Sequence, residues 1–129
     1  MAAASALLAL GDEHFVSLTT YRRSGEAVST PVWIARDGDT LLVTTPDDTG
    51  KVKRLRNSSR VTLAPSGRMG KVADDAPRVE GVAAIEPETP PLTAIFAGKY
   101  KLEYRIFMWV ERRAAKKQKP RVILRISAA

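Results

Sequence analysis

The chain has 129 residues, of which 44% are hydrophobic and 27% charged, as in an ordinary globular protein of one domain spanning 1–129. It has no cysteine and one histidine, which excludes disulfides, thiolate metal sites and a histidine cluster, so we expect no metal. The net charge of +7 indicates an anionic partner.

The positive charge is concentrated in two segments. Residues 51–71 contain seven basic residues and no acidic one, and residues 99–125 contain ten basic residues against Glu103 and Glu111. The partner of such segments is a phosphorylated cofactor, a nucleic acid or an acidic surface. The alternative is that these are solvated basic faces without a partner.

The first ten residues are apolar, but they carry no basic residue and are followed by Asp12 and Glu13. This segment is too short to span a membrane and lacks the basic start of a signal peptide. We therefore expect a short N-terminal helix over 1–12, no membrane partner and a cytoplasmic protein.

Alternating apolar residues predict six strands, at 15–22, 28–35, 41–45, 60–65, 79–85 and 121–126. Gly25 and Gly38 mark hairpin turns, where glycine accepts a positive φ. Pro31 cannot donate to a ladder and belongs at an edge or bulge, and Gly81 indicates a bulge or a close backbone approach. Hairpin-joined strands of this length predict a mainly β fold, an antiparallel barrel whose closure removes exposed edges.

Two helical regions interrupt the strands. Residues 50–57 form a short basic helix, and residues 92–115 form a helical insertion, broken into two helices near Gly98. Residues 66–76 and 116–119 are expected to be loops.

The strand end, turn and helix over 44–56 predict an anion site. Asp48 or Thr49 can cap the helix through a side-chain oxygen, and the first free amides of a helix attract anions. Lys51 and Lys53 add two cations beside these amides. Arg54 follows Lys51 on the helix, and one of the arginines 54 and 56 is expected to pair with Asp47 or Asp48.

The order of several short segments resembles the split-barrel flavin and deazaflavin oxidoreductases, the proteins similar to pyridoxamine 5′-phosphate oxidase. These segments are VSLTT (16–20), RSGE (23–26), STPVW (29–33), KVKRLR (51–56), RVTLAP (60–65), VEGVA (79–83), residues 99–100 and the last strand. Their order and spacing cover residues 14–126. The likeness is closest to the short actinobacterial type, many of which use the deazaflavin coenzyme F420 in place of FMN.

The resemblance implies a six-stranded split barrel of the FMN-binding type and a homodimer with a cofactor groove at each subunit interface. It implies that the phosphate lies on the turn and basic helix and the ring along two strands, with Tyr104 or Trp109 of the partner closing the groove. The implied cofactor-binding residues are Ser29, Pro31, Val32, Trp33, Thr44, Thr45, Thr49, Gly50, Lys51, Lys53, Arg54 and Trp109.

Several of these residues have a plainer interpretation. Trp33 is as typical of a core or interface as of a ring-stacking wall, and lysines are usually solvated. Tyr100 and Tyr104 are weak candidates for a proton donor, and otherwise belong to an interface or the core. His14 is expected at the surface. The basic run at 112–117 is a solvated helix end or a grip for an anionic tail.

The leading hypothesis is an F420-dependent reductase that moves hydride to an unsaturated small molecule, in which the cofactor brings the chemistry. The polyglutamate tail of F420 is anionic and fits the two basic segments. The alternatives are an FMN- or tetrapyrrole-binding protein of the same fold and a cofactor carrier without turnover. A nucleic-acid-binding barrel is disfavoured because only 6% of residues are aromatic.

Overall fold

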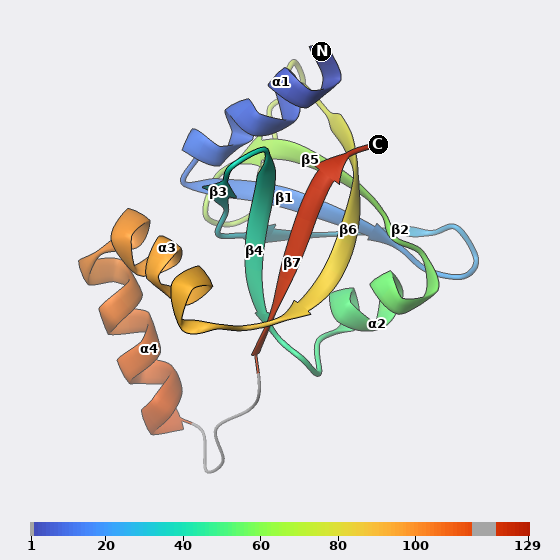
Figure 1. Ribbon diagram of the computed structural model, residues 1–129. Helices are drawn as coiled ribbons and strands as arrows, with labels where there is room; N and C mark the ends of the chain where they lie inside the picture. The colour runs from blue at the N-terminus through green and yellow to red at the C-terminus, as the bar shows by residue number, and fades with distance from the viewer. Residues whose placement is uncertain (1, 115–120) are drawn as a thin grey trace.

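Seven strands form one curved antiparallel sheet in the computed structural model, which describes residues 2–114 and 121–129, and the side chains of 5–110 and 121–129 (Figure 1). The strands are β1 Phe15–Tyr21, β2 Ala27–Val32, β3 Ala35–Asp37, β4 Thr40–Pro46, β5 Arg60–Ser66, β6 Val79–Pro87 and β7 Arg121–Ala128. The predicted mainly β, antiparallel fold is confirmed. The predicted number of six strands is wrong.

The additional strand arises because the segment 28–35 is two strands and not one. Between β2 and β3 the backbone of Ile34 bonds to side chains: its N–H donates to the Tyr100 hydroxyl over 2.9 Å, and its carbonyl accepts from Lys99 Nζ. A ladder cannot use groups that are already bonded to side chains. The chain therefore leaves the sheet at Trp33 and Ile34 and re-enters it on another strand.

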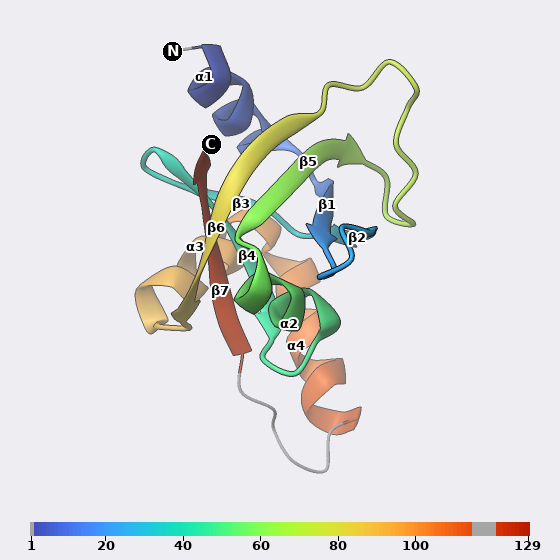
Figure 2. The same cartoon turned by 90° about the vertical axis from the view of Figure 1, so that its right-hand side faces the viewer.

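The neighbouring strands follow the order β2-β1-β5-β6-β7-β4-β3, so the consecutive strands β2 and β3 lie at opposite edges. Only Trp33 and Ile34 separate them, and so short a segment spans at most about 11 Å. The sheet must therefore curl until its two edges approach each other (Figure 2). Among the described residues these edges do not pair, so the expected closed barrel is wrong, while Pro31 does lie on an edge strand as predicted.

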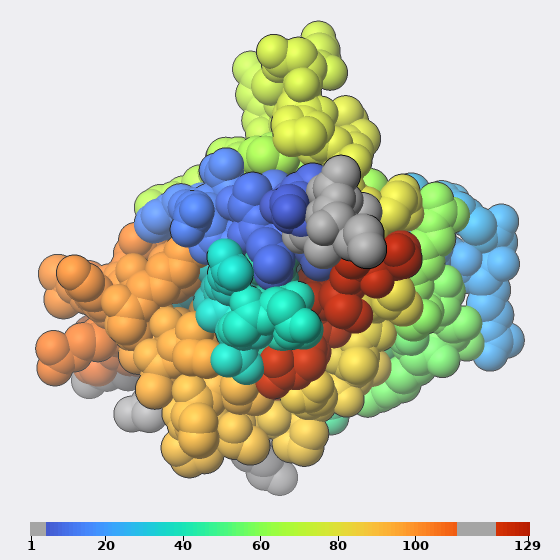
Figure 3. Space-filling model, turned by 45° about the horizontal axis from the view of Figure 1, so that its top comes forward, coloured from blue at the N-terminus to red at the C-terminus, as the bar shows by residue number. Residues whose placement is uncertain are grey.

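The inner face of the curled sheet encloses the larger of two hydrophobic cores. Alternate residues of each strand point inward, and the N-terminal helix α1 (Ala2–Ala9) and the short helix η1 (Leu10–Asp12) add Leu7 and Leu10. Figure 3 shows α1 lying across this end of the molecule, beside the β3–β4 turn. The side chains in this core that are almost completely buried include Leu7, Val16, Leu18, Ile34, Leu41, Val43, Val61, Leu63, Leu124 and Ile126.

A second core lies between the outer face of the sheet and helix α3 (Pro90–Tyr100). Phe96 and Tyr100 pack there on Leu42 and Ile123, the outward residues of β4 and β7. Because both faces of β4 are covered, Leu41, Leu42 and Val43 are all buried in succession. Helix α4 (Leu102–Ala114) follows α3 on the same side of the molecule (Figure 1).

The predicted pair of helices is present, and the break between them lies at Lys101, three residues after Gly98. Lys101 has a φ of 50°, whereas Gly98 continues the helix without a positive φ. The other predicted backbone signals are present: Gly25 and Gly38 have φ values of 91° and 61° in the hairpin turns. The expected loop at 116–119 lies outside the described residues. Within the described part of the chain, no helix is long and apolar enough to cross a membrane.

Candidate functional site

A groove of about 240 Å³ lies at the split of the sheet, where the two edges approach each other. The segment that crosses between the edges supplies Trp33, and strands β1, β2, β4 and β7, helix α4 and the basic helix α2 (Gly50–Asn57) supply the other side chains. The groove is lined by Phe15, Pro31, Val32, Trp33, Thr44, Thr45, Pro46, Lys51, Phe107 and Arg121.

The structure thus brings together half of the residues that the resemblance implies. Pro31, Val32 and Trp33 come from one segment, Thr44 and Thr45 come from another, and Lys51 comes from α2. These residues meet because the sheet curls, which places β2 near β4 although four strands separate them in the sheet order. The split, and not a closed barrel, creates this groove.

Two cations line the groove on its α2 side. Lys51 is half-buried, and burial, together with the charges of Arg54 and Arg121, lowers its pKa. The Arg121 side chain is only 10% exposed, lies opposite Pro46 in the β4–β7 register and approaches Glu88 at 3.9 Å. Cations that are held close together at a partly dry surface favour an anion between them.

The hydroxyls of the strand end are held in a hydrogen-bond network. Thr44 Oγ1 donates to Glu88 over 3.2 Å and accepts from Arg121 Nε over 3.2 Å. Thr45 is buried, and its Oγ1 lies 3.2 Å from Thr49 Oγ1. The contacts with Thr44 and Glu88 hold Arg121 in the wall of the groove.

The apolar wall is built on Trp33. Its ring stacks on the ring of Tyr100 at a centroid distance of 4.3 Å and lies 5.2 Å from that of Phe107. Trp33 thus belongs both to the second core and to the groove, so its two predicted roles are compatible. Next to Pro31 on β2, the buried Thr30 Oγ1 has no partner among the described residues.

Helix α2 begins at the predicted turn but is not capped as predicted. Thr49 is the N-cap residue, yet its hydroxyl donates backward to the Pro46 carbonyl over 3.1 Å and makes no capping bond. Arg54 folds back over Gly50: a Cβ there would lie 2.8 Å from Arg54 Nη1. Arg56 pairs with Asp47 at 2.9 Å, as expected of one of the two arginines.

Other predicted site residues lie outside the lining of the groove. Ser29 bonds to Thr19 through their hydroxyls, and Arg54 Nε donates to Thr20 Oγ1 over 2.6 Å. Lys53 is exposed on α2, and Trp109 is exposed on α4. These assignments, with those of Thr49 and Gly50, stay predictions.

The two tyrosines differ in their surroundings. The Tyr100 hydroxyl is buried and bonds to the backbone of Ile34 and His14, and burial raises its pKa to about 12. Tyr104 is partly buried, with its ring 6.3 Å from that of Trp33. Neither lines the groove, and the proton-donor role stays a prediction. His14 is half-exposed and bonds to Glu103 over 2.9 Å.

Four lining residues were absent from the sequence-based site: Phe15, Pro46, Phe107 and Arg121. Pro46 follows the predicted site residues Thr44 and Thr45, and Phe15 begins a predicted strand, so the sequence contained some indication of both. Arg121 and Phe107 reach the groove only through pairing of β7 with β4 and packing of α4, which no local pattern reveals.

Comparisons with known proteins agree with this architecture. A family model described as pyridoxamine 5′-phosphate oxidase matches residues 2–129, whereas no curated protein matches the chain. Three similar solved structures are a conserved hypothetical protein from Mycobacterium tuberculosis, an F420 reductase and a FAD-binding protein from Mesorhizobium loti.

These structures share the fold at low sequence identity. The M. tuberculosis protein is 22% identical with a TM-score of 0.66, over 99% of this chain and 81% of that one. The F420 reductase is 19% identical with a TM-score of 0.60, over 94% and 91%. The FAD-binding protein is 14% identical with a TM-score of 0.64, over 99% and 88%. Because the family model matches nearly the whole chain, this protein belongs to the pyridoxamine 5′-phosphate oxidase family of split-barrel proteins.

Proposed function

We propose that this protein is a deazaflavin-dependent oxidoreductase, which binds coenzyme F420 in the groove and reduces an unsaturated small molecule. The convergence of Lys51 and Arg121 at an apolar groove walled by Trp33 supports this most directly. A phosphate-bearing cofactor with a flat ring system needs one cationic end and one apolar wall. The solved F420 reductase of the same fold supports the choice of cofactor.

In this proposal the chain binds and orients the cofactor, which supplies the hydride when bound. Lys51 and Arg121 hold the phosphate, with Thr49, Gly50, Lys53 and Arg54 of the turn and helix beside them. Trp33 and Pro31 border the ring, together with the threonine hydroxyls of β4.

A flavin-binding protein or a cofactor carrier is the second candidate. Lys51 and Arg121 are the only ionisable side chains among the described residues that line the groove. Arg121 stays charged at neutral pH and is no proton donor, and Lys51 is assigned to the phosphate. This observation favours a carrier that binds without turnover, and FMN or a tetrapyrrole is its alternative occupant. Its distinguishing property is tight binding with no reductase activity.

We also propose a homodimer, as the family resemblance implies. Leu102 and Ile106 of α4 are 66% and 55% exposed, and Trp109 and Val110 continue the same helix face. Exposed apolar residues at this spacing are typical of an interface. A second copy covering this face would place Trp109 at the interface, whereas Tyr104 lies on the other side of α4, against the second core of its own chain.

The test is a fluorescence titration with coenzyme F420 and, separately, with FMN. We expect micromolar or tighter binding of F420, weaker binding of FMN and a loss of about tenfold in affinity in Lys51→Met, since a charge-assisted contact is removed. Lys71→Met, which removes an exposed lysine from the β5–β6 loop, is the matched control.

Turnover is measured separately, as oxidation of reduced F420 with a panel of unsaturated carbonyl compounds. Binding with turnover supports the reductase, and binding without turnover across the panel favours the carrier. If neither cofactor binds, the proposed cofactor site is wrong. Tetrapyrroles are then titrated in the same way.

A further inference from the structure

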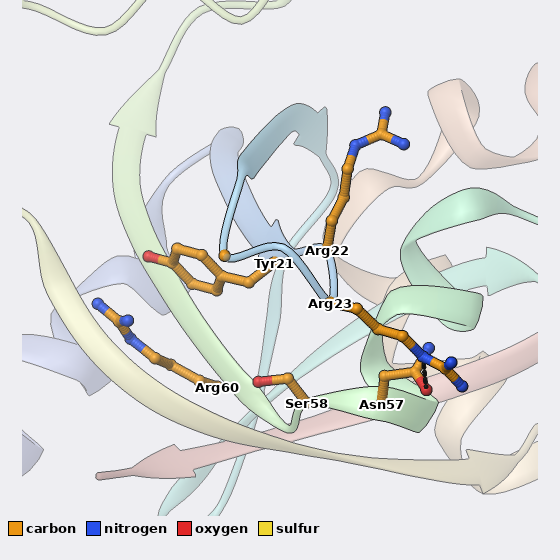
Figure 4. A pocket seen from close by; sticks show the side chains of 7 residues that line it. Tyr21, Arg22, Arg23, Asn57, Ser58 and Arg60 are labelled. Carbon is orange, nitrogen blue, oxygen red and sulfur yellow. Dashed lines mark hydrogen bonds between the residues drawn. The ribbon is translucent and has the colours of Figure 1, made fainter.

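A second pocket, of about 410 Å³, opens at the other end of α2 from Lys51 (Figure 4). It is formed by the end of β1, the β1–β2 turn, the end of α2 and the start of β5. We call it the arginine pocket, and it is lined by Tyr21, Arg22, Arg23, Gly25, Asn57, Ser58 and Arg60. None of these residues lines the groove at the split, and the proposed function gives them no role.

The arginine side chains of this pocket are held through Nε. Arg22 Nε lies 3.3 Å from Glu26, Arg23 Nε donates to Asn57 over 3.2 Å, and Arg60 Nε donates to Glu80 over 3.3 Å. These contacts use Nε, so the two terminal guanidinium nitrogens, the fork that recognises carboxylate and phosphate, are left without a described partner. The side chains are thus partly ordered before any ligand binds.

The wall and the turn of the pocket are also fixed. The guanidinium carbon of Arg60 lies 4.4 Å from the Tyr21 ring centroid, and the Tyr21 hydroxyl bonds to Thr62 over 2.6 Å. In the turn, the Arg22 N–H donates to the Glu26 carbonyl over 2.9 Å, and the Gly25 N–H donates to the Arg22 carbonyl over 2.8 Å. Arg22 and Arg23 therefore stand on a hydrogen-bonded hairpin, and Arg60 stands at the start of β5.

Positive charge is in excess around this pocket. The described residues that line it include three arginines and no carboxylate, and of these Arg23 is bonded to a neutral amide. Nearby, burial and then the charge of Arg22 lower the pKa of Arg54. Glu26 and Glu80, which lie outside the lining, each pair with one arginine and offset part of this charge, and the remaining positive charge favours a further anion.

We propose that the arginine pocket binds a multivalent oxyanion, a phosphate or a di- or tricarboxylate group. The fork geometry of Arg22, Arg23 and Arg60 suits such a group, and the amide of Asn57 and the hydroxyl of Ser58 are further polar contacts. Such a group belongs either to a separate small anion or to the far end of the molecule held in the groove. Helix α2 joins the two sites, and its eight residues span about 12 Å.

In the test, the full chain without cofactor is titrated with pyrophosphate and, separately, with citrate. Binding is measured from the NMR chemical shifts of the arginine Nε–H groups. We expect shifts at Arg22, Arg23 and Arg60, and a loss of about tenfold in affinity in Arg23→Gln and in Arg22→Gln. Both residues are exposed in a turn, so folding is preserved. Lys71→Gln, an equal loss of charge elsewhere, is expected to change the affinity less than twofold.

Absence of shifts at these arginines, or an equal loss in Lys71→Gln, would overturn the proposal. This arm does not depend on the proposed cofactor, so it can fail or succeed by itself. In a second arm the pyrophosphate titration is repeated on protein saturated with F420. Loss of the Arg23 shift there identifies the far end of the bound cofactor as the occupant, and an unchanged shift identifies a separate anion.

Discussion

At the scale of the residue, the positive charge of Lys51 destabilises the folded state. Burial and two neighbouring arginines lower its pKa below 10.5, so the folded state releases its proton before the unfolded state does. The free energy of unfolding should therefore rise as the pH increases from the lowered pKa towards 10.5. We expect Lys51→Met to be at least as stable as the wild type at pH 7 and to lack this rise, as measured by urea unfolding at pH 7 and pH 10.

The same charge should control ligand binding. We expect the affinity for a phosphate-bearing cofactor to fall as the pH rises through the lowered pKa of Lys51, because the neutral amine loses its attraction for the phosphate. Lys51→Arg retains its charge at these pH values and should bind with little pH dependence. An identical pH profile in the wild type and in Lys51→Arg would show that another group controls binding.

Tyr100, unlike the charged Lys51, stabilises the folded state at neutral pH. Its hydroxyl accepts the Ile34 N–H, so Tyr100→Phe leaves a buried donor without its partner and should lower the free energy of unfolding by about 1–3 kcal/mol at pH 7. The phenol pKa is raised to about 12 from 10.0, so the stability that it gives the wild type is present below pH 10 and is lost as the pH rises through about 12. Chemical unfolding at pH 8 and pH 11 should show this additional loss in the wild type and not in Tyr100→Phe.

At the scale of the element, the break between α3 and α4 gives a paired prediction. Lys101 has a positive φ, which a side chain disfavours, so Lys101→Gly should raise the free energy of unfolding by about 0.5–1 kcal/mol. Gly98 is inside a helix, and a Cβ there would meet no described atom within 4 Å, so Gly98→Ala should give a similar gain. Thermal unfolding of both variants checks this. Destabilisation by Gly98→Ala would contradict the helical conformation of Gly98.

This break also shows what local patterns determine. Glycine is the usual signal for a helix end, yet here the helix ends where Tyr100 and Lys99 must reach the backbone of Ile34. The same contacts divide the predicted strand 28–35. Hairpin turns with glycine and alternating strands depend on neighbours in sequence, and they could be predicted. Interruptions that depend on a distant helix could not.

The candidate site likewise contains residues that local patterns predict and residues that only the folded sheet brings in. Lys51 and the threonines of β4 belong to one strand–turn–helix segment, whose pattern indicates an anion site. Arg121 joins it through a pairing between β4 and β7 that closes a long stretch of chain. The residue beside Lys51 could therefore be identified only once the sheet order was known.

At the scale of the whole molecule, the curling of the sheet explains where the groove forms and why basic residues gather at both ends of α2. The crossing at Trp33 and Ile34 brings the edges together, and α2 then lies between the groove and the arginine pocket. Each end of α2 thus meets basic residues from distant strands. Binding at both sites should weaken with added salt, because charges at a surface are screened within about 10 Å at 0.1 M.

The apolar face of α4 carries the last prediction, on oligomeric state. Sedimentation should give the wild type twice the 14.1 kDa mass of one chain. Leu102→Glu with Ile106→Glu should give a monomer, because two buried carboxylates at an apolar interface lack partners. Met69→Glu, at a residue that is 89% exposed on a loop, is the matched control. A monomeric wild type, or a dimer unaffected by the double variant, would exclude this face. If the partner completes the groove, the monomeric variant should also bind F420 more weakly, although Lys51 and Arg121 are intact.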